Sequence, residues 1–396
     1  MRFRPRTVLL LLALLGCGLF AGVSQAQDPD DPCVIDPAYC GEEPPPDEDL
    51  DFQPPPRERT PRKPRGGTGC AAQTPPRDWG DAQAVKPSAP NPLVGLTYFI
   101  DKEWGIPWRQ YQAARGERKR LIGKIALNPQ FKWMGRWDVR KYGNAAGVGQ
   151  FLDRVDCSMP GAVPQIVSFF HEGQSCGGGF TGGGAAEDAR YRRILKAFAQ
   201  AIGSHRVVIA FEPDSLGTIE CLTPSRRSAR IRTLRYGVTQ LAKVPNATVY
   251  IDAGAADWMS VPKATKLLRK VGVSKVRGFM LNATHMVTDR KSIAYGKKIS
   301  ERLGGKHFIV NTSDNGRGPM YTYRGGRRQT IWCNPPNSGL GKPATTKTGS
   351  PRADALLWVN RPGTSHGACK PPGVSGPSVG QWFMSRALSM ARRANW

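Results

Sequence analysis

Short apolar runs alternate with longer amphipathic stretches from Asn91 onward, and this alternation constrains the fold more than any other feature of the chain. The predicted strands span 94–100, 165–170, 207–211, 248–252, 278–282, 308–312 and 355–359. The predicted helices span 191–202, 225–242, 262–271, 289–303 and 378–393. Elements that alternate in this way form a parallel sheet with helices packed against it. For about 300 residues without a dinucleotide-binding glycine motif, we expect the α/β class, as a distorted (β/α) barrel with about seven to eight mostly parallel strands.

The N-terminus carries a predicted export signal. Three arginines among the first six residues precede an apolar run and the small-residue exit Ser24-Gln25-Ala26. This pattern predicts a signal peptide over 1–26 and a secreted product. A lipoprotein signal ending at Cys17 is the alternative. The apolar run is short and interrupted by glycine, so we expect no membrane span.

Residues 27–90 form a predicted disordered linker, because they contain few apolar residues and many prolines. The linker is acidic over 28–51 and basic over 57–65, and the folded domain is expected over 91–396. The formal charge of +26 favours an anionic partner such as a cell-wall polymer. Without a nucleic-acid-binding motif in an exported chain, we expect no nucleic-acid partner and a monomer.

The cysteines predict disulfides rather than a structural metal. The chain has nine cysteines, and eight remain once Cys17 leaves with the signal. An even number in an exported chain is typical of disulfide pairing. No Cys-x2-Cys spacing or histidine cluster occurs, so we expect neither a metal nor another cofactor. The glycine run at 177–184 lacks the ending of a phosphate-binding loop and predicts a mobile loop beside the site.

An acidic turn, Glu212-Pro213-Asp214, follows the predicted strand at 207–211. In an α/β barrel the carboxyl ends of the strands carry the chemistry, so Asp214 is the candidate catalytic acid. The alternative is that Asp214 caps the helix that follows.

Seven short motifs occur one after another along the domain. They are NPQFKW at 128–133, EPDSL at 212–216, YIDAG at 250–254, GFMLN at 278–282, NTSDNG at 311–316, WCNPP at 332–336 and GQWF at 380–383. Together and in this order they resemble glycoside hydrolase family 6, the cellulase family of endoglucanases and cellobiohydrolases. The resemblance implies hydrolysis of β-1,4-glucan polysaccharides or oligosaccharides with inversion, and Asp214 as the general acid.

The resemblance also implies a sugar-binding cleft and two disulfides. The residues implied in sugar binding are Trp133, Trp258 and Trp332 by stacking, and Asp252, Asn282, Asn360 and Thr364 through polar contacts. The implied disulfides join Cys176 to Cys221 and Cys333 to Cys369. Cys70 and Cys157 are then left as candidates for an extra bridge between linker and barrel.

At several positions the chain has other residues where the family pattern has charged ones. Ser175 stands in place of an aspartate beside the acid, and His366 in place of the proposed base aspartate. Asn360 and Thr364 likewise replace a sugar-binding lysine and glutamate. His366 is either a replacement base or a bystander, and Glu172 is a candidate replacement for the carboxylate lost at Ser175.

Two functions remain open from the sequence. One is a secreted, inverting β-1,4-glucanase that retains Asp214. The other is a carbohydrate-binding pseudoenzyme of the same fold, held on the cell wall by its basic surface.

Overall fold

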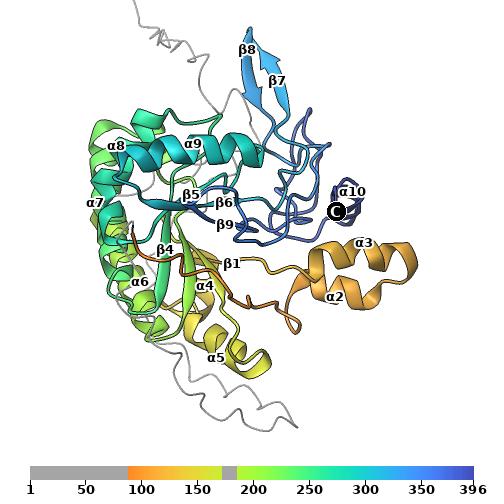
Figure 1. Ribbon diagram of the computed structural model, residues 1–396, viewed down its shortest axis with the longest axis horizontal. Coiled ribbons are helices and arrows are strands. Elements are labelled where there is room, and N and C mark those ends of the chain that lie inside the picture. The colour runs from red at the N-terminus through yellow and green to blue at the C-terminus, as the bar shows by residue number, and fades with distance from the viewer. Residues whose placement is uncertain (1–87, 172–184) are drawn as a thin grey trace, which may run out of the picture.

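The computed structural model describes residues 88–171 and 185–396. The predicted signal peptide, nearly all of the predicted linker, the glycine run, and Glu172, Ser175 and Cys176 lie outside the described residues. Seven strands form one parallel sheet in the order β1-β2-β3-β4-β5-β6-β9, which confirms the expected α/β barrel class (Figure 1). The strands are β1 (Lys132–Gly135), β2 (Gln165–Phe169), β3 (Val207–Phe211), β4 (Ala247–Asp252), β5 (Gly278–Leu281), β6 (His307–Asn311) and β9 (Ala353–Leu357).

The sheet curls until its two edge strands approach each other. The backbone N–H of Phe131, just before β1, donates to the carbonyl oxygen of Trp358, just after β9, at 3.1 Å. The indole N–H of Trp133 donates to the carbonyl of Val359 at 2.8 Å. These two bonds join β1 to β9 at their edges without a full strand ladder, which is the distortion expected of this barrel.

The prediction of a strand over 94–100 is wrong. This segment makes only an isolated parallel bridge, between Tyr98 and Val163. Val94 is 63% exposed, and Gly95 has a φ of 73°, so the run is neither buried nor extended throughout. The first strand is instead β1, which is only four residues long and begins at an exposed lysine.

Helices cover the outside of the sheet (Figure 1). The predicted helices 191–202, 225–242, 262–271 and 289–303 are confirmed, and they belong to α6 (Ala185–Ile202), α7 (Pro224–Leu241), α8 (Val261–Val271) and α9 (Asp289–Arg302). The helix expected over 378–393 is shorter, since α10 (Met384–Arg392) begins after Gly380, whose φ is 80°. The helices missed by the sequence analysis are α2 (Ile106–Ala113), α3 (Gly116–Ala126), α4 (Arg136–Tyr142) and α5 (Val148–Ser158).

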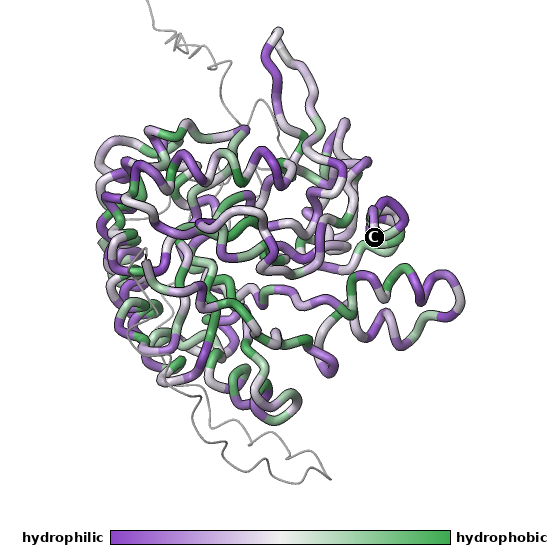
Figure 2. The backbone as a smooth tube through the Cα atoms, in the orientation of Figure 1, coloured by the Kyte–Doolittle hydropathy of each residue, from purple (hydrophilic) through white to green (hydrophobic). Residues whose placement is uncertain are grey.

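Apolar side chains fill two layers, one on each face of the sheet. Val208 and Ala210 of β3 face a core inside the barrel, together with Tyr250 and Met280 of the neighbouring strands. The alternate residues of β3 pack against the outer helices. A strand buried on both faces is continuously apolar, which explains the run at 207–211. Figure 2 shows apolar segments along the inner strands and alternating apolar and polar residues along the outer helices.

A two-stranded antiparallel hairpin, which the sequence analysis did not predict, projects from the barrel (Figure 1). It consists of β7 (Tyr321–Arg324) and β8 (Arg327–Thr330). The turn residues Gly325 and Gly326 have φ values of 54° and 75°, which glycine adopts at low cost and two-residue hairpins favour. Within the described ranges, no helix is long and apolar enough to span a bilayer.

Candidate active site

Two carboxylates lie at the carboxyl ends of neighbouring strands. Asp214 follows β3, and Asp252 is the last residue of β4. The backbone N–H of Asp214 donates to Oδ2 of Asp252 at 3.0 Å, and the N–H of Gly254 donates to the same oxygen at 3.2 Å. Glu212 and Asp214 both have positive φ, at 50° and 67°, which non-glycine residues adopt rarely and most often at functional sites.

The environment of the Asp214–Asp252 pair raises the pKa of both carboxyl groups. Burial raises the pKa of Asp214, although the Thr284 hydroxyl, which donates to Oδ1 at 2.6 Å, and the nearby His285 oppose the shift. Burial and the charge of Asp214 also raise the pKa of Asp252 well above its usual range. Oδ1 of Asp252 is buried without a hydrogen-bond partner among the described residues. A raised pKa favours the protonated form of a carboxyl group, which is the form that general acid catalysis needs.

The Trp258 ring packs on polar side chains next to the Asp214–Asp252 pair. It stacks on the imidazole of His285, with centroids 4.9 Å apart and planes 14° apart. Nδ1 of His285 lies 2.8 Å from Oδ1 of Asp257, whose Oδ2 accepts from Thr330 at 3.2 Å. Gly217 packs under the Trp258 ring, where an added Cβ would lie 2.2 Å from it. The ring that we predicted to stack on sugar is therefore half-buried and held in one orientation.

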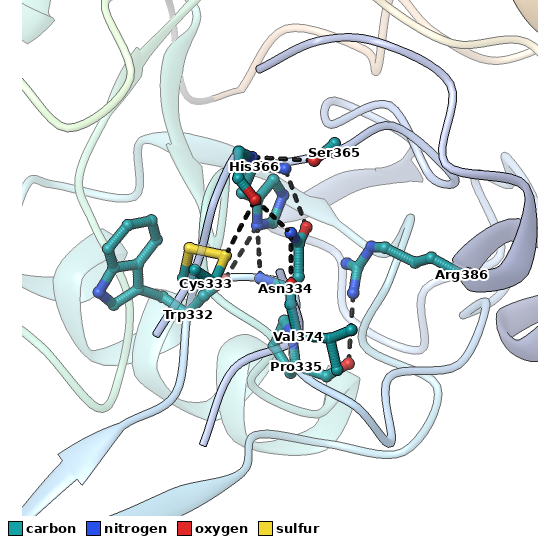
Figure 3. Close-up of a disulfide and its surroundings, with 10 residues drawn as sticks. Trp332, Cys333, Asn334, Pro335, Ser365, His366, Val374 and Arg386 are labelled. Carbon is teal, nitrogen blue, oxygen red and sulfur yellow. Dashed lines mark hydrogen bonds between the residues drawn. A yellow bond between two sulfur atoms is a disulfide. The ribbon is translucent and has the colours of Figure 1, made fainter. Parts of the chain in front are cut away.

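The other predicted tryptophans differ in how much surface they offer. Trp133 is only 8% exposed, and its ring lies 5.2 Å from that of Phe169 and 5.7 Å from the guanidinium of Arg361. Trp332 is half-buried, and its indole points away from Asn334 and His366 (Figure 3). The sugar-stacking roles of both stay predictions.

Asn282 is fully buried and joins neighbouring loops. Its amide N–H groups donate to the carbonyls of Val287 and Asn311, each at 3.0 Å, and its Oδ1 accepts from the Val287 N–H at 2.9 Å. These contacts use both amide donors inside the protein. Its predicted role toward substrate therefore stays a prediction, and the structure adds a role in positioning the chain after β5.

The segment after β9 contains Asn360 and Thr364, for which a sugar-binding role is predicted. The Asn360 amide donates to Oδ2 of Asp314 at 3.4 Å and accepts from the Arg361 N–H at 2.8 Å. Thr364 is buried, and its hydroxyl donates to the carbonyl of Arg361 at 2.8 Å. Burial raises the pKa of Asp314 even though Arg386 opposes the shift. The sequence analysis missed Asp314, although an acid three residues beyond a strand is a detectable signal.

His366 lies in the same segment, behind the disulfide (Figure 3). Its Nδ1 is 3.1 Å from the backbone N of Asn334 and 3.0 Å from the carbonyl oxygen of Trp332. Burial, followed by the charge of Arg386, lowers the pKa of His366 to about 3. At neutral pH the imidazole is therefore uncharged, and one of its nitrogens is committed to the loop at 332–334.

The disulfide implied between Cys333 and Cys369 is confirmed, with Cα atoms 5.7 Å apart. Cys157 and Cys221 also form disulfides, and their expected partners, Cys70 and Cys176, lie outside the described residues. Across 88–171 and 185–396, no group of three or more His, Cys, Asp or Glu side chains could hold a metal ion.

The curled parallel sheet and the carboxylates at its carboxyl end define an α/β-barrel architecture with an acidic site at the end where such barrels carry their chemistry. Residues 98–394 match the family model of the glycosyl hydrolases family 6, and the chain belongs to this family.

Two bacterial endoglucanases are among its relatives. Endoglucanase A of Cellulomonas fimi is 40% identical over 309 residues, which cover 78% of this chain and 63% of that protein. Endoglucanase 1 of Streptomyces halstedii is 31% identical over 291 residues, which cover 72% and 84% of the two chains. The chain thus spans less than two thirds of the first of these relatives.

The fold is shared with solved structures. The endoglucanase Cel6 from Mycobacterium tuberculosis, in complex with a methyl-cellobiosyl-thio-cellobioside, superposes with a TM-score of 0.67 at 32% identity. The match covers 76% of this chain and 99% of that one. Cellobiohydrolase II from Humicola insolens, with glucose and cellotetraose, has a TM-score of 0.64 at 20% identity and supports the fold alone.

Proposed function

We propose that this protein is a glycoside hydrolase that cleaves β-1,4-glucan with inversion, and that Asp214 is its general acid. The observation that carries the proposal is the half-buried Asp214 carboxyl, of raised pKa, at the carboxyl end of β3 in a chain of this family. The endoglucanase names of the two bacterial relatives support the substrate class.

The contacts of Asp214 suit proton donation. Because the Thr284 hydroxyl occupies Oδ1, the transferable proton resides on Oδ2. When that proton moves to the glycosidic oxygen, the C–O bond breaks and Asp214 becomes negatively charged. The Thr284 hydroxyl and the nearby His285 then stabilise the carboxylate, since both favour its charged form. Water attacks the anomeric carbon from the opposite face and transfers its proton to a base.

His366 suits a structural role better than the role of that base. Nδ1 of His366 can accept from the Asn334 N–H or donate to the Trp332 carbonyl, but the neutral ring can do only one. An unpaired buried N–H is costlier than an under-satisfied carbonyl, so the acceptor form is favoured. That form places the hydrogen on Nε2 and leaves no lone pair for water. Asp314, hydrogen-bonded to Asn360 and of raised pKa, is our second candidate for the base.

The test is release of reducing sugar from barley β-glucan and cellohexaose by the full chain, beside Asp214→Asn, His366→Asn and Asp314→Asn. Turnover that disappears in Asp214→Asn supports the proposal, and the other two variants then identify or eliminate each candidate base. The alternative is a glucan-binding pseudoenzyme, which the substitutions at Ser175 and His366 favour. Binding of cellohexaose without turnover by the parent chain would establish that alternative.

We also propose that the chain is secreted through residues 1–26 and associates with anionic wall polymers. The formal charge of +26 supports the second part. Co-sedimentation with isolated cell walls at low and high salt tests it, because a charge-driven association weakens as ionic strength rises.

A further inference from the structure

The β7–β8 hairpin has two different faces. Register pairs Tyr321 with Thr330 and Tyr323 with Arg328, so these four side chains share one face. Thr322 and Gln329 are paired with each other and lie on the opposite face. One strand pair thus presents two tyrosines, an arginine and a threonine on one side, and Thr322, Gln329 and Arg327 without an aromatic residue on the other.

The tyrosine face leads into the candidate active site. At the base of the hairpin, the Thr330 hydroxyl donates to Oδ2 of Asp257. Asp257 in turn contacts His285, on which Trp258 stacks. The tyrosine face therefore begins beside Asp257 and His285, the residues next to Trp258, and continues outward along the hairpin.

The outer part of this face is held open to solvent. Tyr323 is 72% exposed, which is high for a large aromatic side chain in a folded domain. The guanidinium of Arg328 lies 4.3 Å from the centre of the Tyr321 ring, a cation–π contact that favours this arrangement of the two side chains. At the base, the N–H of Ile331 donates to the Met320 carbonyl at 2.9 Å, and Cys333 is tied to Cys369. The hairpin is thus rigidly rooted beside the site.

We propose that the tyrosine face of the hairpin, Tyr321, Tyr323 and Arg328, is an additional binding site for a glucan chain leaving the cleft past Trp258. Exposed aromatic rings flanked by a hydrogen-bond donor are the chemistry that binds sugar rings, with stacking on the apolar face and donation to hydroxyls. The inference rests on the proposed function. It adds to it a preference for long chains, since a short oligosaccharide held at the acid would not reach the exposed tip.

The experiment compares chain lengths. KM and Kd are measured for cellotriose, celloheptaose and soluble barley β-glucan, with the full chain and with Tyr323→Ala. Thr322→Ala and Gln329→Ala are the matched controls, because they alter the same hairpin on its opposite face. We expect Tyr323→Ala to weaken binding of the long substrates by about threefold to tenfold, while cellotriose and both controls stay within about twofold of the parent.

The outcomes separate this inference from the proposed function. If the parent chain hydrolyses glucan but Tyr323→Ala behaves like the parent on every length, the inference is wrong and the function stands. Equal losses on cellotriose and barley β-glucan, or equal losses in the controls, would mean that the hairpin acts through folding. If Tyr323→Ala and Arg328→Ala weaken only binding of polygalacturonate, the face is an anion site and our assignment fails. A parent that neither binds nor cleaves glucan overturns both proposals.

Discussion

Each end of the barrel contains a buried aspartate, and the two environments shift the aspartate pKa in opposite directions. Near the amino ends of the strands, Asp354 is fully buried and bound by the Arg277 guanidinium through two bonds of 2.8 and 2.9 Å. At the carboxyl ends, Asp252 is equally buried, and within the described residues it forms no ion pair. Burial raises both pKa values, but hydrogen bonds and charge from Arg277 and His307 lower that of Asp354 below its usual range.

The comparison shows how one scaffold separates stability from chemistry. The pKa of the paired carboxylate is lowered, which favours its charged form, whereas the pKa of the carboxyl group without an ion pair is raised, which favours its protonated form. The predictions below test this division, beginning with the largest effect.

Asp214→Asn should reduce kcat on barley β-glucan by about 10²- to 10⁴-fold, because the amide cannot donate a proton to the leaving oxygen. Since the amide keeps the shape of the carboxyl group, we expect the melting temperature to stay close to that of the parent. A loss of activity that is matched by loss of the folded state would contradict the assignment.

Asp354→Asn should lower the free energy of unfolding by about 3 to 5 kcal/mol, because it leaves the Arg277 charge buried and unpaired. Denaturant titration measures the change. Glu220→Gln is the control, since the Glu220–Lys263 pair is mostly exposed on its acidic side and should contribute about 1 kcal/mol or less. If the double variant Arg277→Met and Asp354→Leu is no more stable than Asp354→Asn, the unpaired charge is not the cause.

The two carboxylates should give stability profiles of opposite sign against pH. The folded pKa of Asp354 is lowered, so its contribution is present above the ordinary aspartate value of about 3.9 and is lost as pH falls through the folded value. The folded pKa of Asp252 is raised, so its ionisation costs stability as pH rises from about 3.9.

These profiles can be separated by melting curves between pH 3 and 8. Asp252→Asn should gain about 1 kcal/mol on the parent as pH rises, which corresponds to a few degrees in melting temperature. Asp354→Asn should instead lose most relative to the parent at neutral pH. Parallel curves for parent and Asp252→Asn would show that Asp252 ionises normally.

His366→Asn should have the smallest effect, a change in kcat of less than about threefold, because an amide oxygen can replace Nδ1 as the acceptor for the Asn334 N–H. The measurement is the pH profile of kcat/KM. If His366 were the base, the acid limb would lie near its pKa of about 3 and would disappear in the variant, together with most of the activity.

Much of the fold was predictable because central parallel strands are buried on both faces. The run at 207–211 is apolar throughout, and every residue of β3 is buried. The edge strand β1 was missed because it has four residues and an exposed lysine, and the β7–β8 hairpin because its arginines hide the alternation.

The site was predictable where a residue directly follows its own strand, as Asp214 does. Thr284, His285 and Asp257 were missed because their importance depends on contacts between segments far apart in sequence, such as the Thr284–Asp214 bond. The tautomer of His366 likewise follows from two backbone groups that only the folded loop places beside it. No spacing rule along one sequence contains this information.

The buried pair at the amino ends also fixes where the N-terminal segment joins the barrel. Arg277 donates to the Ala89 carbonyl at 3.2 Å, and the Asn91 amide donates to the Asp354 carbonyl at 2.7 Å. Ala89 and Asn91 therefore contact the end of the barrel opposite the end that carries Asp214. An attachment made at this end of the barrel would leave the opposite face, which carries Asp214, open to a polymer too large to diffuse.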